Sequence, residues 1–581
     1  MTKDFRGTKY DAVGNLTNVV YPASPSIVLA YDPLNRLTAM VDGVGTTLYG
    51  YDGAGQVLSE DGPWANDTVS YTYANRLRMG LSVQAPNGAP WSQSYGYDMA
   101  RRLTGVSSPA GTFGYSRNDG PYDSSGYYSQ SSSEVTSLAL PGGAYITNTF
   151  DAVARETGTW LLNSSGSNLD SYVYTYNQGN QRTEVVRTAG DYVTYTYDNM
   201  GELKTAVGKE MSGAGRWQEQ FGYAYDGAGN LNYRTNNTLL DQFNVNSQNE
   251  LTTVTNGGRL TVAGSTTSRA TSVTVNTSNA VLYADTSFAS TNQPWAYGVN
   301  TYTAAAVDTY GRRSTNSVTI SLTGTNSYSY DLNGNLLSDG TRNFAYDDEN
   351  ELIAVWQANA WSNNFAYDGK LRRRIERDFT WNAGTPGWQL TNEIHFIYDG
   401  NLVIQERNAA NLPQVTYTRG NDLSGKLQGA GGIGGLLART DNTKLMAGDP
   451  LASAYYHCDG NGNVTCLMSP YQQITAKYLY DPFGNTLAMY GALATANTYR
   501  FSSKEWNGNS GLYYYLYRFY DPNLQRWPNR DPLGEPGFET LHHVSQTLFR
   551  AQNPKNTISP FSFFVTIQVF CRCSIAGPIY S

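Results

Sequence analysis

The chain has 581 residues, a formal net charge of −8 and only 15% charged residues. This length exceeds one ordinary globular core, so we expect either several domains or an extended repeat body. The negative charge gives no basic footprint, which makes nucleic acid and anionic membrane poor candidates for partners. The 46 Tyr, against 19 Phe, and the 58 Gly favour turn-rich β structure, and four Cys are too few for a disulfide framework.

A Tyr-Asp pair, followed by a turn and then Gly-Asn-Leu or Asn-Arg-Leu, recurs along almost the whole chain. The first copies begin at Tyr10, Tyr31 and Tyr51, at intervals of 21 and 20 residues. Further copies stand at Tyr73, Tyr97, Tyr197, Tyr225, Tyr330, Tyr346, Tyr367 and Tyr480. A nearly fixed period of this kind marks a repeat architecture, in which one supersecondary unit stacks on the next.

Each repeat has the pattern of one β-hairpin. Residues 172–176 and 192–197 alternate Tyr with Val or Thr, a period of two that predicts strands with one face toward a core. Asp, Asn and Gly then supply a tight turn, and a new apolar residue opens the returning strand. About 20 residues hold two strands and two turns, so one repeat is predicted to be one hairpin.

Because a lone hairpin is only marginally stable in water, the copies must pair edge to edge. The excess of Tyr suits a wall one sheet thick, with the hydroxyls toward a wet side. The sequence therefore predicts an all-β fold whose hairpins spiral into a hollow shell, over residues 1–255 and again over 323–496. An open β-solenoid or a set of propellers is the alternative, although the 16 residues from Tyr330 to Tyr346 argue against equal propeller blades.

Residues 256–322 interrupt the Tyr-Asp pattern. Their short Thr/Val runs and polar turns predict a small inserted β-sandwich-like module. Trp295 and Tyr297 could stack on a sugar, but an aromatic pair on a small sandwich is more often core. We therefore assign the insert no ligand.

Two strings of residues match chemical motifs, and both have a simpler interpretation. Residues 429–434 spell a dinucleotide fingerprint but lack a strand immediately before and a helix immediately after, so we interpret them as a glycine loop. His457, Cys458 and Cys466 offer three soft ligands, whereas a structural zinc site takes four. We predict no metal and no cofactor.

The segment over residues 497–537 is denser in aromatic residues than any repeat. It reads Tyr499-Arg-Phe-Ser-Ser-Lys-Glu505, then Gly511-Leu-Tyr-Tyr-Tyr-Leu-Tyr517, then Arg526-Trp-Pro-Asn-Arg530-Asp531-Pro532. This segment resembles the RHS repeat-associated core. The Tyr-Asp copies resemble the YD repeats of the same family, which includes bacterial Rhs toxins, the C subunits of Tc toxins and the shells of teneurins.

The resemblance implies a β-shell that encloses a variable C-terminal toxin, released by self-cleavage just after the core. In those relatives an Asp of an Arg-Asp-Pro element acts with a second Asp as an aspartyl protease, and Arg530-Asp531-Pro532 matches that element. One carboxylate would hold a proton while the other activates water, and Arg530 would keep the base ionised. No Asp follows Asp531 here, so we name Asp531 and Arg530 as the candidate pair but favour a structural turn for Asp531. Any enzymatic activity would be a single-turnover self-cleavage.

The predicted function is a structural scaffold that carries or shields a C-terminal effector of a secreted or contact-dependent competition system, with its own C-terminal cargo as partner. A cell-surface adhesion protein that binds carbohydrate or a receptor, and a self-cleaving shell, are the alternatives. Residues 538–581 form a variable tail whose apolar stretch, 558–570, is too short to span a bilayer. The start lacks an apolar signal region, so we expect a secreted or cell-surface location as part of a longer polypeptide.

Overall fold

The computed structural model describes residues 7–119, 132–266, 268–530 and 573–575. These residues form 48 strands, the short helix α1 (Asn442–Met446) and the two 3-10 turns η1 (Pro141–Gly143) and η2 (Phe501–Ser503). The predicted all-β class is thus confirmed. None of the helices in this part of the chain is long and apolar enough to cross a membrane.

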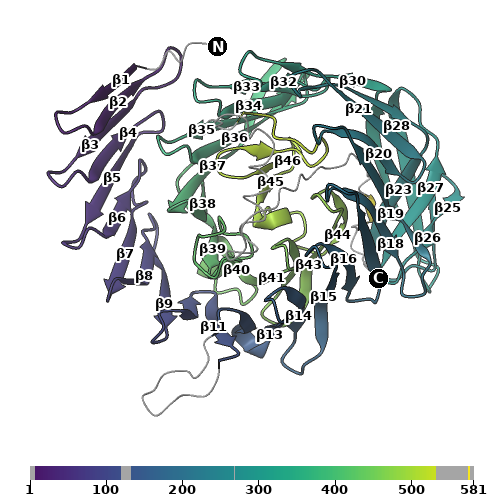
Figure 1. Ribbon diagram of the computed structural model, residues 1–581, viewed down its shortest axis with the longest axis horizontal. Coiled ribbons are helices and arrows are strands. Elements are labelled where there is room, and N and C mark those ends of the chain that lie inside the picture. Colours follow the sequence, from purple (N-terminus) through teal and green to yellow (C-terminus); the bar gives the residue numbers. More distant parts are fainter. Residues whose placement is uncertain (1–6, 120–131, 267, 531–572, 576–581) are drawn as a thin grey trace.

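The larger sheet is an antiparallel meander of 23 strands. From β1 to β22 each strand pairs with the next one in the chain, and β30 then pairs with β22. Figure 1 shows it as a curved wall that passes from purple through blue to teal. Its strands are β1 (Gly7–Tyr10), β2 (Leu16–Val20), β3 (Ile27–Tyr31), β4 (Leu37–Val41), β5 (Thr46–Tyr51), β6 (Val57–Asp61), β7 (Val69–Ala74), β8 (Leu77–Val83), β9 (Trp91–Tyr97), β10 (Leu103–Ser108), β11 (Gly111–Arg117), β12 (Val135–Ala139), β13 (Tyr145–Phe150), β14 (Glu156–Leu162), β15 (Asn168–Tyr176), β16 (Arg182–Arg187), β17 (Tyr192–Tyr197), β18 (Leu203–Lys209), β19 (Gly215–Tyr225), β20 (Leu231–Asn236), β21 (Leu239–Val245), β22 (Leu251–Gly257) and β30 (Thr325–Ser327).

The second sheet is another antiparallel meander, of 14 strands, from β31 to β44. It follows the same curve on the inner side of the first, so the two sheets form successive turns of one spiral (Figure 1). Its strands are β31 (Ser329–Tyr330), β32 (Leu336–Ser338), β33 (Asn343–Tyr346), β34 (Leu352–Gln357), β35 (Trp361–Tyr367), β36 (Arg373–Asn382), β37 (Gly387–Asp399), β38 (Leu402–Asn408), β39 (Pro413–Arg419), β40 (Leu436–Asp441), β41 (Ser453–Cys458), β42 (Val464–Met468), β43 (Ile474–Tyr480) and β44 (Thr486–Tyr490).

Each Tyr-Asp turn is closed by its own aspartate. In the second repeat Asp32 Oδ1 accepts from the backbone N–H groups of Leu34 (2.9 Å) and Arg36 (3.0 Å), and Arg36 Nε donates to Asp32 Oδ2 at 2.7 Å. Between them Asn35 takes a positive φ of 59°, which Asn tolerates better than most residues. An Asp followed four residues later by an Arg or Asn donor therefore specifies the turn locally.

In several repeats the tyrosine binds its strand to the preceding one. Tyr51 Oη donates to the carbonyl of Leu37 at 2.8 Å, and Tyr197 Oη donates to the carbonyl of Arg182 at 2.7 Å. In both cases the acceptor is the first residue of the preceding strand. The same bond is made by Tyr73, Tyr176, Tyr225, Tyr367 and Tyr480. A phenol, unlike a phenyl ring, can make this bond, which explains why Tyr outnumbers Phe.

The wall is two sheets thick over part of its length, which corrects the expectation of a wall one sheet thick. A buried apolar cluster joins β9–β11 of the first sheet to β38–β42 of the second, and it includes Val106, Phe113, Ile404, Leu437 and Met468. One face of each hairpin must be covered to stabilise the sheet, and the next turn of the spiral covers it.

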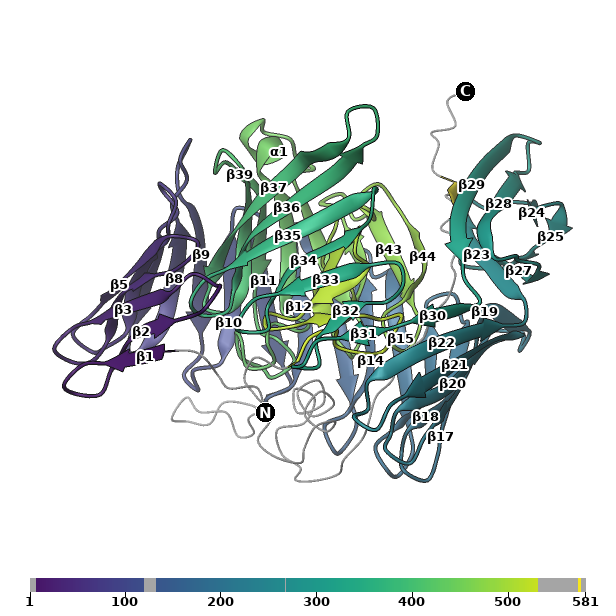
Figure 2. The same cartoon turned by 90° about the horizontal axis from the view of Figure 1, so that it is seen from above.

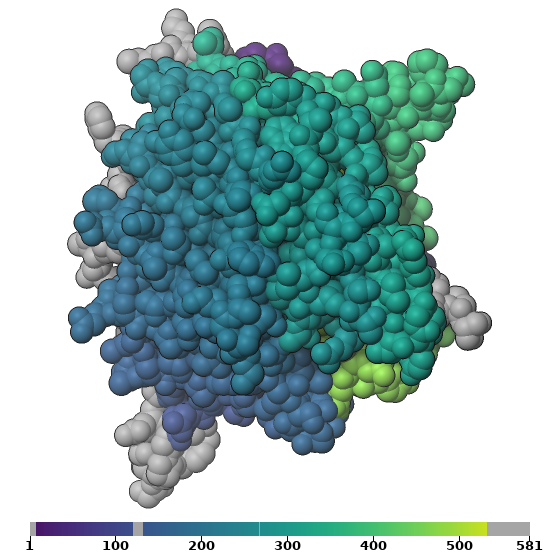
Figure 3. Space-filling model, turned by 90° about the vertical axis from the view of Figure 1, so that its right-hand side faces the viewer, coloured from purple at the N-terminus to yellow at the C-terminus, as the bar shows by residue number. Residues whose placement is uncertain are grey.

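The residues between β22 and β30 form the predicted sandwich-like insert. Together with one strand from the tail, they make two four-stranded sheets around a cluster that includes Val262, Val273, Phe288 and Tyr302. Figure 3 views the molecule from the side that carries the insert, in teal beside the blue repeats. One sheet contains β23 (Leu260–Thr266), β26 (Val281–Leu282), β27 (Ser287–Gln293) and β48 (Cys573–Ile575), and the other contains β24 (Ser272–Val275), β25 (Ser278–Asn279), β28 (Gly298–Val307) and β29 (Arg313–Leu322).

The aromatic pair of the insert divides between core and surface. Trp295 packs against the insert's apolar cluster, and its Nε1 donates to the carbonyl of Gly258 at 3.0 Å. Tyr297 is 80% exposed. The interpretation of this pair as core therefore holds for Trp295 and is wrong for Tyr297.

Candidate functional site

Residues 497–530, here called the core segment, lie inside the curve of both sheets. They contain η2 and a small antiparallel sheet of β45 (Glu505–Asn507), β46 (Leu512–Tyr514) and β47 (Phe519–Tyr520). Figure 1 shows this segment in yellow-green at the centre of the molecule. The turn from β45 to β46 is closed by Asn507, whose Oδ1 accepts from Ser510 Oγ at 2.8 Å, and by Gly511 with φ of 70°.

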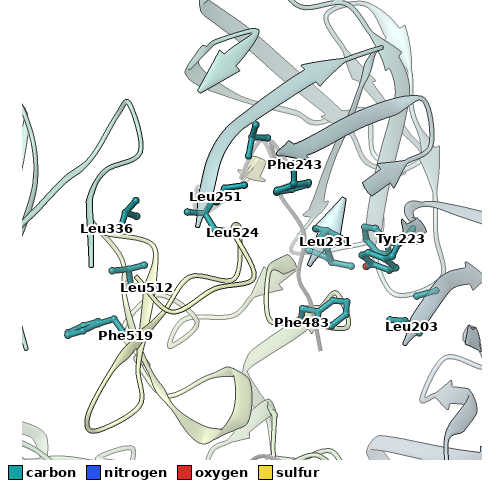
Figure 4. Close-up of a cluster of buried hydrophobic side chains, with 14 of the residues drawn as sticks. Leu203, Tyr223, Leu231, Phe243, Leu251, Leu336, Phe483, Leu512, Phe519 and Leu524 are labelled. Carbon is teal, nitrogen blue, oxygen red and sulfur yellow. The ribbon is translucent and has the colours of Figure 1, made fainter. Parts of the chain in front are cut away.

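Apolar side chains of the core segment join the two sheets. Leu512, Phe519 and Leu524 share one buried cluster with Leu251 of the first sheet and Leu336 of the second (Figure 4). Each of the five is no more than 5% exposed. Burying a Leu or Phe side chain contributes about 1.5–3 kcal/mol, so this cluster stabilises the segment in its position.

A buried ion-pair network anchors the same segment to β36. Arg373, which is fully buried, donates to Glu505 Oε1 at 2.6 Å and to Glu376 Oε2 at 2.7 Å. Asn507 Nδ2 donates to the other oxygen of Glu376 at 2.6 Å. A second pair joins Arg342 to the buried Asp521. Buried charges are tolerated only when they are paired and hydrogen-bonded, so the core segment is bound in a defined register.

Three carboxyl groups meet around this network. Burial raises the pKa of Glu376, and the charges of Glu505 and Glu406 raise it further against the opposing effect of Arg373. Burial raises the pKa of Glu406 as well, and the charge of Glu505 raises it further. The Tyr417 hydroxyl donates to Glu406 Oε1 at 2.7 Å. Burial therefore favours the protonated forms of Glu376 and Glu406 more than it would for an exposed glutamate. Sequence inspection did not reveal them, because no local motif links their positions.

The last described residues of the core segment are fastened to turns of the second sheet. Asn529 Nδ2 donates to the carbonyl of Asn350 at 3.0 Å, and the backbone N–H of Arg530 donates to Asn335 Oδ1 at 2.9 Å. The side chain of Arg530 is exposed. Asp531 lies outside the described residues, so the catalytic role of Asp531 and Arg530 stays a prediction.

The glycine string at residues 429–434 is a folded loop. It connects β39 to β40, and Asp422 Oδ2 accepts from the backbone N–H groups of Ala430 (2.6 Å) and Gly432 (3.1 Å). The strand β40 follows it where a dinucleotide fold would place a helix. The interpretation as a loop is confirmed.

His457 has a partner that the sequence did not indicate. Its Nδ1 lies 2.9 Å from Oδ2 of Asp170 on β15, and Lys477 Nζ donates to Oδ1 of the same carboxylate at 2.5 Å. Cys466 belongs to this group, since the ligand atoms of Asp170, His457 and Cys466 lie within 4.8 Å of one another. By contrast, Cys458 Sγ lies 3.9 Å from Ser503 Oγ.

These donors could hold a metal ion, but their present contacts favour an internal ion pair. Burial would raise the pKa of Asp170, yet the Lys477 ammonium and His457 outweigh it and hold the pKa well below its usual range. Burial raises the pKa of Cys466 well above its ordinary value, so the thiol keeps its proton. We assign the group a structural role, in which Asp170 of the first sheet is bound by two residues of the second.

Part of the chain matches a known family of repeats. The family model described as RHS Repeat matches residues 10–47, which contain the first two Tyr-Asp turns. Residues 10–47 of the chain thus match an RHS repeat. The match covers the same turn and strand pattern that recurs through both sheets, so the resemblance to the YD-repeat family is confirmed.

The relatives of this chain include named toxins. The tRNA3(Ser)-specific nuclease WapA of Bacillus spizizenii is 30% identical over 216 residues, which cover 36% of this chain and 8% of that protein. The double-stranded DNA deaminase toxin A of Burkholderia cenocepacia is 25% identical over 248 residues, which cover 40% of this chain and 16% of that protein. The chain thus spans less than a fifth of the length of either relative.

Solved structures give a weak overall likeness. The crystal structure of TcdB2-TccC3-TEV is 16% identical and has a TM-score of 0.43, covering 96% of this chain and 28% of that chain. The Tc holotoxin pore of Photorhabdus luminescens is 15% identical with a TM-score of 0.39, over 96% of this chain and 28% of that one.

Proposed function

We propose that this RHS-repeat protein is a structural scaffold, a β-shell that carries and shields a variable C-terminal effector. The observation that carries this proposal is the burial of the core segment inside both turns of the spiral. The backbone of Arg530 is bonded to Asn335 in a turn of the second sheet, and we propose that the chain after residue 530 continues into the shell from there. In this proposal the segment that follows the core segment is the cargo that the walls shield.

The far end of the chain supports the carrying role. β48, within the tail at residues 538–581, pairs in parallel with β23 of the insert, with Cys573 opposite Gly264. The body of the protein thus binds its own C-terminal region at two places, once through the core segment and once through the insert. The toxins named among the relatives favour an effector function for such a region, and we propose a secreted or cell-surface location for the whole protein.

Thiol accessibility tests the shielding directly. The tail carries Cys571 and Cys573, whereas Cys458 and Cys466 are free thiols within the second sheet. A maleimide attached to a 10-kDa polyethylene glycol is too large to pass between paired strands. The native full-length chain should take up none of it, and the denatured chain should take up four.

A variant with Cys571→Ser and Cys573→Ser is the matched control, because it leaves only the two shell thiols. Rapid attachment of polymer to the native parent chain, absent from this variant, would place the tail outside the walls and overturn the shielding role. Attachment of polymer to both the parent and the double variant in the native state would show that Cys458 and Cys466 of the second sheet become accessible to the reagent.

Self-cleavage is the second candidate, and the fixed position of Arg530 next to Asp531 favours it. We propose that Asp531 would be the acting carboxylate and that Arg530 would keep it ionised. The intact mass of the purified chain tests this reaction. A shortened species that disappears in Asp531→Asn supports it, and a single full-length species in both proteins removes it.

A further inference from the structure

The hairpin formed by β36 and β37 projects beyond the strands around it. Strand β35 pairs with β36 only as far as Thr380, and β38 pairs with β37 only from Ile394 onward. The backbone N–H of Trp381 still donates to the carbonyl of Ala360 at 2.9 Å, and past these contacts β36 and β37 pair with each other. Figure 2 shows the hairpin reaching past its neighbours, and Figure 3 shows the same green lobe standing out from the body.

One face of the hairpin tip is apolar. Phe379 lies opposite Leu390, and Trp381 lies opposite Trp388. The two indole rings meet edge to face, with centroids 5.2 Å apart. Trp388 is 41% exposed and Leu390 is 52% exposed. Alternation along each strand puts these four side chains on one side, so the tip presents a continuous apolar face to solvent.

The tip also carries no charge. Residues 379–392 contain neither acidic nor basic side chains. Charged groups begin at the base, where Arg377 Nε bonds to Glu393 Oε2 at 2.5 Å and Asp378 accepts from Asn392 Nδ2 at 3.1 Å. The tip can therefore leave water without desolvating an ion, and its two strands satisfy each other's backbone groups.

We propose that this hairpin tip inserts into the interfacial layer of a phospholipid bilayer whose headgroups are zwitterionic. Tryptophan is the side chain that prefers this layer, because its apolar ring and polar N–H suit the boundary between acyl chains and water. A projecting, convex tip enters a fluid bilayer without a preformed groove. The net charge of −8 opposes an anionic surface, whereas an uncharged tip suits neutral headgroups.

This inference goes beyond the proposed scaffold, since it places one hairpin of the shell against a membrane surface. The tip would insert into the interfacial layer of one leaflet only, as interfacial anchors do. The contact would orient the molecule with the β36–β37 hairpin toward the bilayer.

Flotation of the full chain with phosphatidylcholine vesicles tests the proposal. The parent chain should float with the vesicles, and Trp388→Thr combined with Leu390→Thr should reduce the partition coefficient about tenfold or more, since each lost apolar contact weakens insertion. The circular dichroism spectrum should match that of the parent, and the melting temperature should fall only slightly, because the Trp381–Trp388 contact is lost. Tyr310→Ser, at an 83% exposed aromatic residue in the β28–β29 turn, is the matched control and should float like the parent.

Several results would overturn the proposal. The parent chain could fail to float, or the double variant could float equally well. Binding to phosphatidylglycerol vesicles alone, abolished by salt, would assign the contact to charged groups elsewhere. If sedimentation velocity showed self-association that the double variant abolishes, with no vesicle binding, the tip would be an interface between copies of this chain.

Discussion

The repeat turns and the core segment are held in opposite ways. In a repeat turn the decisive contacts span four residues, as between Asp32 and Arg36. In the core segment they span much larger separations, such as the 132 residues between Arg373 and Glu505. The contacts of a turn therefore lie within its own hairpin, whereas those of the core segment require both sheets to be in place.

This difference predicts how far the structural effect of a substitution extends. Losing one turn removes bonds within one hairpin, and neighbouring hairpins keep their own bonds. Losing an anchor of the core segment leaves buried charges without partners at the place where both sheets meet. The effects of single substitutions should consequently be large in the core segment and small in the turns.

Arg373→Met should have the largest effect. It leaves Glu376 and Glu505 buried without their cation, which typically costs about 3–5 kcal/mol. We expect the free energy of unfolding measured in urea to fall by that amount, with faster amide hydrogen exchange in β45–β47.

Arg155→Met is the control for this prediction. Arg155 also pairs with a carboxylate, Asp151, but its side chain is 26% exposed and the pair belongs to one turn. Its loss should cost less than about 1 kcal/mol. Equal losses from the two substitutions would contradict the distinction between anchor and turn.

Glu351→Gln should have the next largest effect, and it should stabilise. In most turns an Arg or Asn donates to the aspartate, but here Glu351 stands four residues after Asp347. Burial, followed by the charge of Asp347, raises the pKa of Glu351 to about 11. A glutamine amide can donate to Asp347 at every pH, so we expect a gain of about 1–3 kcal/mol at pH 8.

The raised pKa of Glu351 also predicts how the free energy of unfolding changes with pH. The ordinary pKa of Glu351 is 4.5, so above that pH the unfolded chain releases a proton that the folded chain keeps. The free energy of unfolding should therefore fall by up to about 1.4 kcal/mol per pH unit as the pH rises from about 4.5 toward 11. Glu351→Gln should reduce this slope, as measured by urea unfolding at several pH values.

Glu250→Gln is the matched control for the acidic turn. There the roles are exchanged, because Asn246 Nδ2 donates to Glu250 Oε2 at 2.7 Å. Since this carboxylate already has a donor, the substitution should give no gain at pH 8. A similar gain at both positions would mean that removing negative charge in general, rather than supplying a donor, stabilises the shell.

Asp151→Ala should have the smallest effect. Asp151 Oδ1 accepts from the backbone N–H groups of Val153 and Arg155, both at 3.0 Å. Removing these bonds from a partly exposed turn should cost about 0.5–1.5 kcal/mol. Faster hydrogen exchange should be confined to β13 and β14, and loss of protection in β45–β47 would contradict the local character of the turns.

The same division explains what the sequence could predict. The Asp and the donor four residues later lie together in the chain, so the hairpin, its period and the all-β class could be read directly. The excess of Tyr predicts hydroxyls that face a wet side, whereas those of Tyr51 and Tyr197 bond to the preceding strand. The period of two shows that one face of each sheet is buried. It does not show whether the opposite face contacts solvent or another sheet.

The candidate site could be predicted only in outline. The density of aromatic residues marked residues 497–537 as distinct, but nothing near Glu505 indicates Arg373. Likewise His457 was noted for its cysteine neighbours, whereas its partner Asp170 lies 287 residues away. Such contacts depend on which residues of the second sheet pack against which residues of the first. A single sequence carries no local signal for that alignment.

A density map of the full chain by electron cryomicroscopy tests the central claim most directly. It should show residues 497–530 inside both turns of the spiral, with Arg373 against Glu505 and an enclosed space that receives the chain after Arg530. A map with this segment on the outer surface, or with the chain leaving it directly into solvent, would contradict the encapsulating scaffold.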